Sequence, residues 1–181
     1  MRTKKILVAS AILSVITLMT LNSCKTTIPP NAVAVKPFFL NKYLGKWYEI
    51  ARIDFKHEEG LNNVTATYSL NKDGSVKVDN KGYDFEKITW KNSIGKAKFV
   101  GDKNEAKLKV SFFGPFYSGY NVIAIDKDYK YALVAGESLD YLWILSRKTT
   151  IPDETKEAYL AIATKAGYDV SRLNWIEHND L

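Results

Sequence analysis

Short segments that alternate apolar and polar residues follow one another from residue 45 to residue 147 of this 181-residue chain. The clearest is 107–112, Lys-Leu-Lys-Val-Ser-Phe, in which every second side chain is apolar. A period of two places alternate side chains on opposite faces, so each segment is predicted to form a β-strand. Short polar loops such as 72–74 separate the segments and favour hairpins. The strands are expected near residues 46–53, 62–71, 74–83, 86–100, 104–113, 117–126, 129–136 and 140–147.

Consecutive strands with hairpin spacing predict an antiparallel meander. An open meander leaves two edges exposed, and closing the sheet into a barrel removes them. We therefore expect an all-β fold, an eight-stranded antiparallel up-and-down β-barrel, in one domain over residues 38–181.

One segment, residues 152–166, has the pattern of a helix. Pro152, Asp153 and Glu154 are suited to a helix N-terminus. The later strands are apolar on both faces, which indicates that another element covers the outer wall there. We expect the helix to pack on that wall and to be followed by a short strand at 173–176. Its apolar face is expected to contain Tyr159, Ile162, Ala163 and Ala166.

The interior of an eight-stranded barrel is either filled by side chains or holds one small ligand. The alternation predicts which side chains point inward but leaves this choice open. Glu49 shares the parity of Trp47; it either meets a polar group inside or, as we favour, belongs to a bulge that turns it to solvent. The other inward residues are expected to be Trp47, Ala51, Ile53, Val64, Ala66, Tyr68, Leu70, Val76, Val78, Leu108, Val110, Phe112, Val122, Ala124, Trp143 and Leu145.

The first 23 residues have the composition of an export signal. Basic residues at positions 2, 4 and 5 precede an apolar run at 6–21, which is shorter than the roughly 20 residues of a membrane span. Residues 21–24, Leu-Asn-Ser-Cys, resemble a bacterial lipobox, in which the cysteine is acylated and becomes the N-terminus. Cys24 is then a lipid anchor; a simple signal peptide with an unrelated cysteine is the alternative. Residues 24–37 contain three prolines and are expected to form an extended tether.

Several functional classes are excluded by composition. Cys24 is the only cysteine, which excludes disulfides and zinc sites built from several thiolates. Three positive charges belong to the signal, which lowers the formal net charge from +6 to +3 and leaves no argument for nucleic acid. His57 and His178 lack the partners of a metal site, and no phosphate-binding loop or nucleophile elbow is present. We expect no enzymatic activity, no metal and no cofactor.

Three motifs in order resemble those of the lipocalin family. The first is a Gly-x-Trp-Tyr sequence that opens the first strand, and the second is an aspartate three residues before a tyrosine in a late turn. The third is an arginine at the end of the last barrel strand. The resemblance covers about residues 38–178 and is strongest to the bacterial outer-membrane branch related to apolipoprotein D. The motif residues are Gly45, Trp47, Tyr48, Asp126, Tyr129 and Arg147.

The resemblance implies that Trp47 closes one end of the barrel and that Arg147 stacks across it, so the ligand belongs at the other end. It also implies a single-chain amphiphile, a fatty acid or a lysophospholipid, stored or transported for maintenance or repair of the outer membrane. The best-known enzymatic relatives use a cysteine inside the barrel, which this chain lacks. The residues expected to contact the ligand are Ala66, Tyr68, Val78, Val110, Phe112 and Trp143.

The resemblance further implies a protein anchored in the outer membrane through Cys24 and facing the periplasm. Lys25 agrees with this, because an acidic residue at that position retains many lipoproteins at the inner membrane. The expected partners are a lipid and the membrane, and a homodimer is left open. Two other functions also stay open: a carrier of a flat ligand such as a porphyrin or sterol, and a structural or interaction module with a filled interior.

Overall fold

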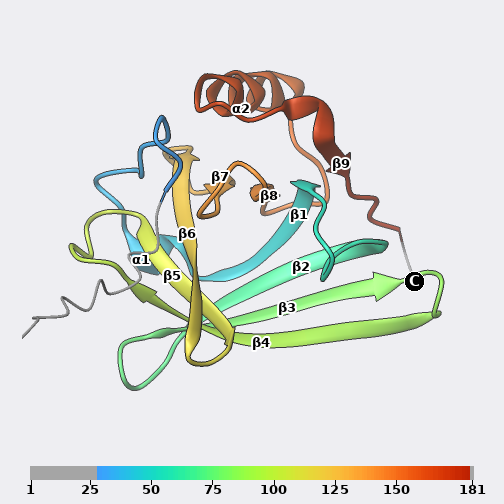
Figure 1. Cartoon of the computed structure of the whole chain (residues 1–181), viewed down its shortest axis with the longest axis horizontal. Coiled ribbons are helices and arrows are strands. Elements are labelled where there is room, and N and C mark those ends of the chain that lie inside the picture. The colour runs from blue at the N-terminus through green and yellow to red at the C-terminus, as the bar shows by residue number, and fades with distance from the viewer. Residues whose placement is uncertain (1–27, 180–181) are drawn as a thin grey trace, which may run out of the picture.

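The computed structural model describes residues 28–179. Antiparallel strands form a closed barrel (Figure 1). Neighbouring strands follow sequence order from β2 to β8, and β1 closes the barrel by pairing with both β8 and β2. The eight-stranded barrel is therefore confirmed, with strand ends within three residues of those predicted. The strands are β1 (Gly45–Ile53), β2 (Leu61–Leu70), β3 (Val76–Asp84), β4 (Thr89–Phe99), β5 (Lys107–Phe113), β6 (Phe116–Ile125), β7 (Tyr131–Ala135), β8 (Leu142–Ser146) and β9 (Leu173–Trp175).

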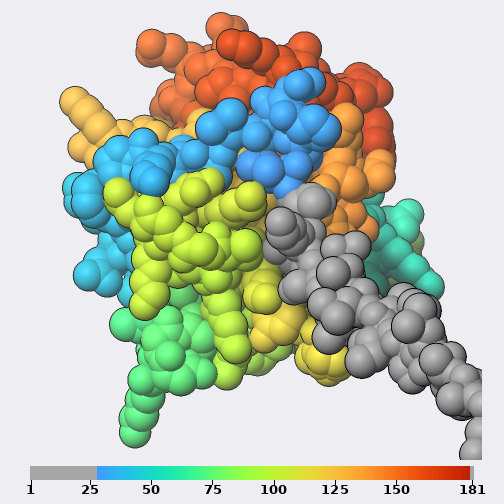
Figure 2. Space-filling view, turned by 60° about the vertical axis from the view of Figure 1, so that its left-hand side comes forward, coloured from blue at the N-terminus to red at the C-terminus, as the bar shows by residue number. Residues whose placement is uncertain are grey.

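The predicted signal peptide, residues 1–23, and the predicted anchor, Cys24, lie outside the described residues. The described part of the segment predicted as a tether lies against the barrel, and Figure 2 shows it as a blue band across the surface. The Val35 amide donates to the Val122 carbonyl (2.8 Å), and the Val35 carbonyl accepts from the Ala106 amide (2.9 Å). The boundary between tether and domain stays a prediction.

Helix α2 (Asp153–Lys165) packs on the outer wall of the barrel, as predicted (Figure 1). Tyr159, Ala163 and Ala166 are buried against that wall. Ile162 is 39% exposed, so its assignment to the buried face is wrong; it lies at the edge of the stripe that the other three define. Within residues 28–179 no helix is long and apolar enough to cross a bilayer.

A bulge in β1 changes which of its side chains point inward. The register with β8 shifts between Glu49 and Ala51, so that Ile50 and Ala51 both pack in the outer cluster under α2. Ile53 follows them into the same cluster. The predictions that Ala51 and Ile53 point inward are therefore wrong, and Arg52 takes the inner side instead.

Strand β6 has a similar irregularity. Its register with β7 shifts between Val122 and Ala124. Val122 and Ile125 pack in the interior cluster, whereas Ala124 packs in the outer cluster, so its inward assignment is wrong. Leu70 is also wrongly assigned to the interior: it is the last residue of β2, next to a turn, and is 55% exposed.

The C-terminal segment bridges a seam in the barrel wall. In the first part of the barrel, Gly45–Tyr48 of β1 pairs directly with β2. Further along, β9 pairs with Ala51–Ile53 of β1, which confirms the short final strand. Beyond β9 the Glu177 carbonyl accepts from the Asn63 amide of β2 (2.9 Å). Residues distant in sequence therefore complete the wall between β1 and β2.

Trp47 and Arg147 close the end of the barrel next to the short helix α1 (Leu40–Tyr43), an element that the sequence analysis did not predict. The guanidinium carbon of Arg147 lies 3.8 Å from the centroid of the Trp47 ring. Trp47 is fully buried, and its Nε1 donates to the Tyr43 carbonyl (2.8 Å). Tyr48 packs instead against the outer cluster. The Arg147 guanidinium contacts five backbone carbonyls, those of Lys42, Tyr43, Leu44, Lys46 and Tyr129.

The remaining motif residues support this closed end. Gly45 has a φ of +96°, and a Cβ there would lie 3.4 Å from Arg147 Nη1, so glycine suits both the conformation and the contact. The Asp126 carboxylate accepts a hydrogen bond from the Tyr131 amide (2.6 Å) and so fixes the turn before β7. That turn holds Tyr129, whose carbonyl accepts from Arg147 Nε (3.2 Å).

Replacing Arg147 by lysine is expected to lower the free energy of unfolding by about 2 to 4 kcal/mol. Lysine keeps the charge but cannot reach the same set of carbonyls from a planar fork, so partly buried acceptors lose their donors. Chemical denaturation followed by tryptophan fluorescence measures the change. The exposed neighbour Lys148 provides the control, because Lys148→Ala should change stability by no more than about 0.5 kcal/mol. Equal effects of the two substitutions would contradict the role given to Arg147.

Candidate functional site

The barrel holds a cavity of about 660 Å³. This volume lies within the range of about 300–1,000 Å³ that is usual for small-molecule pockets. Phe55 of the β1–β2 loop, Phe113 and Phe116 at the β5–β6 hairpin and Tyr141 of the β7–β8 loop line its open end. The cavity therefore opens at the end of the barrel opposite Trp47. The chain does not form the filled interior that the sequence left open.

The residues predicted to contact a ligand come together in this cavity. They lie on four different strands, β2, β3, β5 and β8, and all six line the cavity wall. Their role as ligand contacts stays a prediction. The residues are Ala66, Tyr68, Val78, Val110, Phe112 and Trp143.

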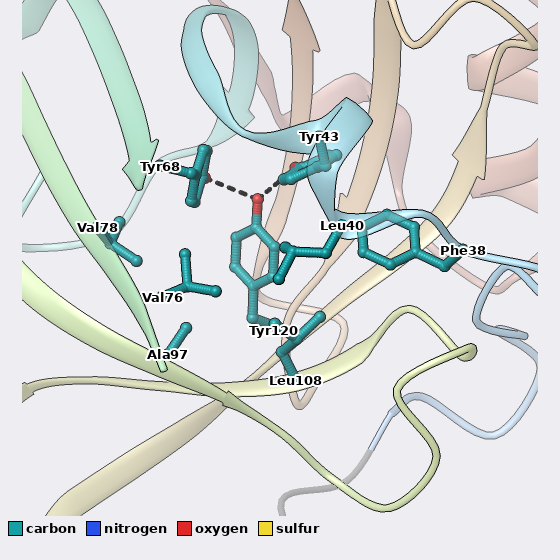
Figure 3. A pocket seen from close by; sticks show the side chains of 9 residues that line it. All are labelled: Phe38, Leu40, Tyr43, Tyr68, Val76, Val78, Ala97, Leu108 and Tyr120. Carbon is teal, nitrogen blue, oxygen red and sulfur yellow. Dashed lines mark hydrogen bonds between the residues drawn. The ribbon is translucent and has the colours of Figure 1, made fainter. Parts of the chain in front are cut away.

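Three tyrosines form the floor of the cavity (Figure 3). The Tyr120 hydroxyl is hydrogen-bonded to the hydroxyls of Tyr43 (2.6 Å) and Tyr68 (2.7 Å). Burial raises the pKa of all three hydroxyls above the usual value, so the cluster is neutral at physiological pH. Below it the interior is lined by apolar side chains such as Val76 and Leu108. The hydroxyl groups of the floor therefore hydrogen-bond to one another and are surrounded by apolar side chains.

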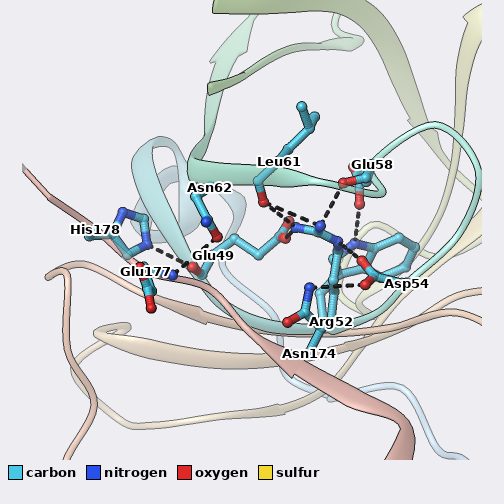
Figure 4. Close-up of polar contacts among 10 residues, drawn as sticks. Glu49, Arg52, Asp54, Glu58, Leu61, Asn62, Asn174, Glu177 and His178 are labelled. Carbon is cyan, nitrogen blue, oxygen red and sulfur yellow. Dashed lines mark hydrogen bonds and ion pairs between the residues drawn. The ribbon is translucent and has the colours of Figure 1, made fainter. Parts of the chain in front are cut away.

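A buried arginine organises the wall near the open end (Figure 4). The Arg52 side chain is fully buried, and all five of its N–H groups have acceptors. Its Nε donates to Asp54 Oδ1 (2.6 Å) and its Nη1 to Glu49 Oε1 (2.8 Å). Nη2 donates to the Glu58 carbonyl (2.5 Å), and both terminal nitrogens reach the Leu61 carbonyl (3.3 Å). Arg52 therefore has no donor left for a ligand.

Glu49 lines the cavity and is only 5% exposed. The interpretation that we favoured, a bulge residue whose side chain turns to solvent, is wrong, because the side chain of Glu49 points into the barrel. The bulge is present, but it turns Ile50 and Ala51 outward and leaves Glu49 inside. The ion pair with Arg52 makes this burial tolerable, because an unpaired buried carboxylate would cost several kcal/mol.

The pKa of Glu49 is raised to about 8, mainly by burial and then by the nearby Glu58 carboxylate, while Arg52 acts in the opposite direction. Burial also raises the pKa of Glu58, which accepts a hydrogen bond from Trp143 Nε1 (3.0 Å) and faces the same cavity. Two carboxyl groups near one buried arginine thus hold protons more tightly than they would in water.

Sequence reasoning missed Glu58, Phe55 and Tyr141 as cavity residues, and it missed Arg52, which does not line the cavity but pairs with the lining residue Glu49. Strict alternation places the Arg52 side chain on the outer face, and the bulge turns that side chain inward. The other three lie in loops, which carry no period from which an inward direction could be read. The one available signal was an arginine among apolar residues in the first strand, a position that demands a buried partner.

The two histidines lie in different environments. His57 lines the mouth from an exposed loop position, whereas His178 Nε2 hydrogen-bonds to the Glu49 carbonyl (2.8 Å) from the C-terminal segment. Burial lowers the pKa of His178. Among residues 28–179 no group of three histidine, cysteine or acidic side chains could hold a metal ion.

A closed antiparallel barrel with an apolar-walled cavity and one closed end is the architecture of a protein that binds a small hydrophobic ligand. The lipocalin-like domain family matches residues 38–178 of the chain. The chain is 54% identical to the outer membrane lipoprotein Blc of Citrobacter freundii over 156 residues, which cover 86% of this chain and 88% of that protein. This protein therefore belongs to the lipocalin family.

Two further comparisons agree. The chain is 37% identical to apolipoprotein D of Cavia porcellus over 153 residues, covering 80% of this chain and 79% of that protein, which confirms the predicted relation to apolipoprotein D. Insecticyanin of the tobacco hornworm Manduca sexta matches in structure with a TM-score of 0.66 at 19% identity, covering 85% of this chain and 88% of that one. At that identity the likeness shows the fold alone.

The buried state of Glu49 predicts a pH-dependent stability. Its pKa is raised from 4.5 to about 8 in the folded protein, so the unfolded chain loses the proton first as the pH rises. The free energy of unfolding should therefore fall between pH 5 and pH 8, by up to about 1.4 kcal/mol per pH unit from this group. Urea titrations at several pH values measure the slope.

Glu49→Gln should flatten that slope, because glutamine does not titrate. Glu59→Gln, an exposed change in the adjacent loop, should leave the slope as it is in the unchanged protein. The same slope in Glu49→Gln and in the unchanged protein would show that Glu49 is not the source of the pH dependence.

Proposed function

We propose that this chain is a lipoprotein of the outer membrane that stores or transports a fatty acid or a lysophospholipid in its barrel cavity, for maintenance or repair of that membrane. Acylated Cys24 holds it in the membrane, and the barrel faces the periplasm. Two features support the proposal: the lipobox-like sequence that ends at Cys24, and the similarity to the Citrobacter freundii protein Blc, which is named an outer membrane lipoprotein. The protein acts by binding and carries out no reaction.

The apolar cavity is the observation on which the ligand class rests. Val78 of β3 and Val110 of β5 line its walls, and Leu145 and Phe112 add further apolar surface. Each methylene of an alkyl tail buried there contributes about 0.8 kcal/mol. Part of this gain offsets the entropy lost when the ligand is captured. A tail of lipid length therefore has enough driving force to bind.

The distribution of polar groups favours an amphiphile with its head at the mouth. The tyrosine floor satisfies its own hydrogen bonds, and the apolar walls lie above it. Charged side chains line the opposite, open half of the cavity, with Glu49 and Glu58 on one side and Lys81 and Lys91 on another. An alkyl tail inserted toward the floor leaves the polar head among these charges.

Filling the cavity should abolish lipid binding. Ala66→Trp places an indole among the cavity walls and is expected to weaken binding of a lysophospholipid by about tenfold or more, since about 1.4 kcal/mol of lost tail burial suffices. Native mass spectrometry of delipidated protein mixed with micromolar lysophospholipid measures the bound fraction.

Thr67→Trp is the matched control, because Thr67 is the next residue of β2 and is exposed on the outer face. It should bind lipid as the unchanged protein does. Absence of a complex with the unchanged protein at micromolar lipid would overturn the proposed function. A porphyrin or sterol that displaces the lysophospholipid would favour the carrier of flat ligands.

The anchor has its own test. Cys24→Ala should abolish incorporation of labelled palmitate and release the protein from the membrane fraction into the soluble periplasmic fraction. The substitution lies outside the barrel domain, so lipid binding by the released protein should be retained. Membrane association that survives Cys24→Ala would contradict anchoring through this thiol.

A further inference from the structure

Three aromatic side chains form one corner of the cavity mouth. Tyr141 and Trp143 are stacked with ring centroids 6.2 Å apart. Phe55 meets both edge-on, at 5.4 Å from Tyr141 and 6.0 Å from Trp143. All three are half-buried and line the cavity. Aromatic faces attract cations, and quaternary ammonium groups in particular.

Two carboxylates line the same part of the cavity. Glu58 Oε2 accepts from Trp143 Nε1 at 3.0 Å, which fixes the carboxylate at the edge of the aromatic corner. Glu49 reaches the cavity from β1 and is 95% buried, since only 5% of it is exposed. Glu49 Oε1 is paired with Arg52, whereas Glu49 Oε2 and Glu58 Oε1 accept no hydrogen bond from any described residue. These two carboxylate oxygens line the cavity without a donor from the described part of the chain, so they are available to a ligand that brings donors or positive charge.

Arg52 does not reverse this preference. Its five N–H groups are occupied by acceptors of the protein, so it offers nothing to a phosphate or carboxylate. With Glu49, Asp54 and Glu58 ionised beside the single positive charge of Arg52, the charges in this corner sum to −2. An anionic head placed here would be repelled, whereas a cation would be attracted. Burial also raises the pKa of both carboxyls, and neighbouring carboxylates add to the rise (Glu58 at Glu49, Asp54 at Glu58), a cost that a bound cation would relieve.

We propose that this corner is a subsite for the ammonium group of the ligand's head, formed by the carboxylates of Glu49 and Glu58 and the aromatic faces of Phe55, Tyr141 and Trp143. The inference rests on the proposed function and narrows its ligand class to single-chain lipids with a choline or ethanolamine head. Exposed Lys81, whose Nζ lies 4.2 Å from the centroid of the Trp90 ring, lines the cavity from β3 and suits the phosphate of such a zwitterionic head, whereas Lys91 on β4 is already paired with Asp84 (2.9 Å).

Four probes with the same alkyl chain separate the head from the tail: a lysophosphatidylcholine, a lysophosphatidylglycerol, a fatty acid and an alkyltrimethylammonium. Binding of each to delipidated protein is measured by native mass spectrometry and tryptophan fluorescence at a pH above 8, where Glu49 ionises. The two ammonium-bearing probes should bind about tenfold more tightly than the two anionic probes. Equal affinity for all four would overturn the subsite while leaving the lipid carrier intact. Failure of all four to bind would overturn both proposals.

Substitutions then locate the preference. Glu58→Gln keeps an oxygen that can accept from Trp143 Nε1 but removes the charge. It should reduce the preference for ammonium heads by about tenfold without weakening the binding of lysophosphatidylglycerol. Tyr141→Leu should do the same by removing an aromatic face, whereas Tyr141→Phe should keep the preference. Exposed Glu59→Gln is the control for charge alone. Thermal unfolding by circular dichroism establishes that each variant is folded. A preference that survives in both Glu58→Gln and Tyr141→Leu would refute the assignment.

Discussion

The contact between Arg147 and Trp47 is the constraint on which the rest of the barrel depends. The guanidinium covers the indole at 3.8 Å and at the same time binds carbonyls of the segment before β1 and of the turn before β7. One side chain thereby joins the start and the end of the strand sequence. Because this end is closed by packed side chains, the hollow part of the interior is confined to the other end, where a ligand enters.

The cavity divides into two chemical environments. Its lower half is apolar and ends on hydroxyls of Tyr43, Tyr68 and Tyr120 that bond to one another. The half nearer the mouth contains the carboxyl groups of Glu49 and Glu58. They lie beside Arg52, whose N–H groups are all hydrogen-bonded to the protein. An amphiphile likewise has an apolar tail and a polar head. The polarity of the cavity wall therefore fixes the direction in which it inserts. Charge near the mouth therefore contributes to selectivity among heads, while the tail supplies the affinity.

The strand order, the closure and the outer helix were predictable because alternation and hairpin spacing are local signals. The same signals failed at Glu49–Ala51 and at Val122–Ala124, where a bulge inserts one residue and reverses every later side chain on the strand. This is why Arg52, central to the site, was missed while Trp47 at the start of the same strand was placed correctly. Phe55, Glu58 and Tyr141 lie in loops whose direction is set by tertiary contacts alone.

The bridging of β1 and β2 by the C-terminal segment has a consequence for the kinetics of folding. Residues 173–177 complete the wall beside the buried Arg52, although they lie far along the sequence from both of the strands that they join. Until this segment docks, water reaches the ion pairs behind the seam, and the wall lacks its final cross-strand pairing. Closure of the seam is therefore a long-range step, in which the entropy of closing a long loop is lost before the new contacts repay it.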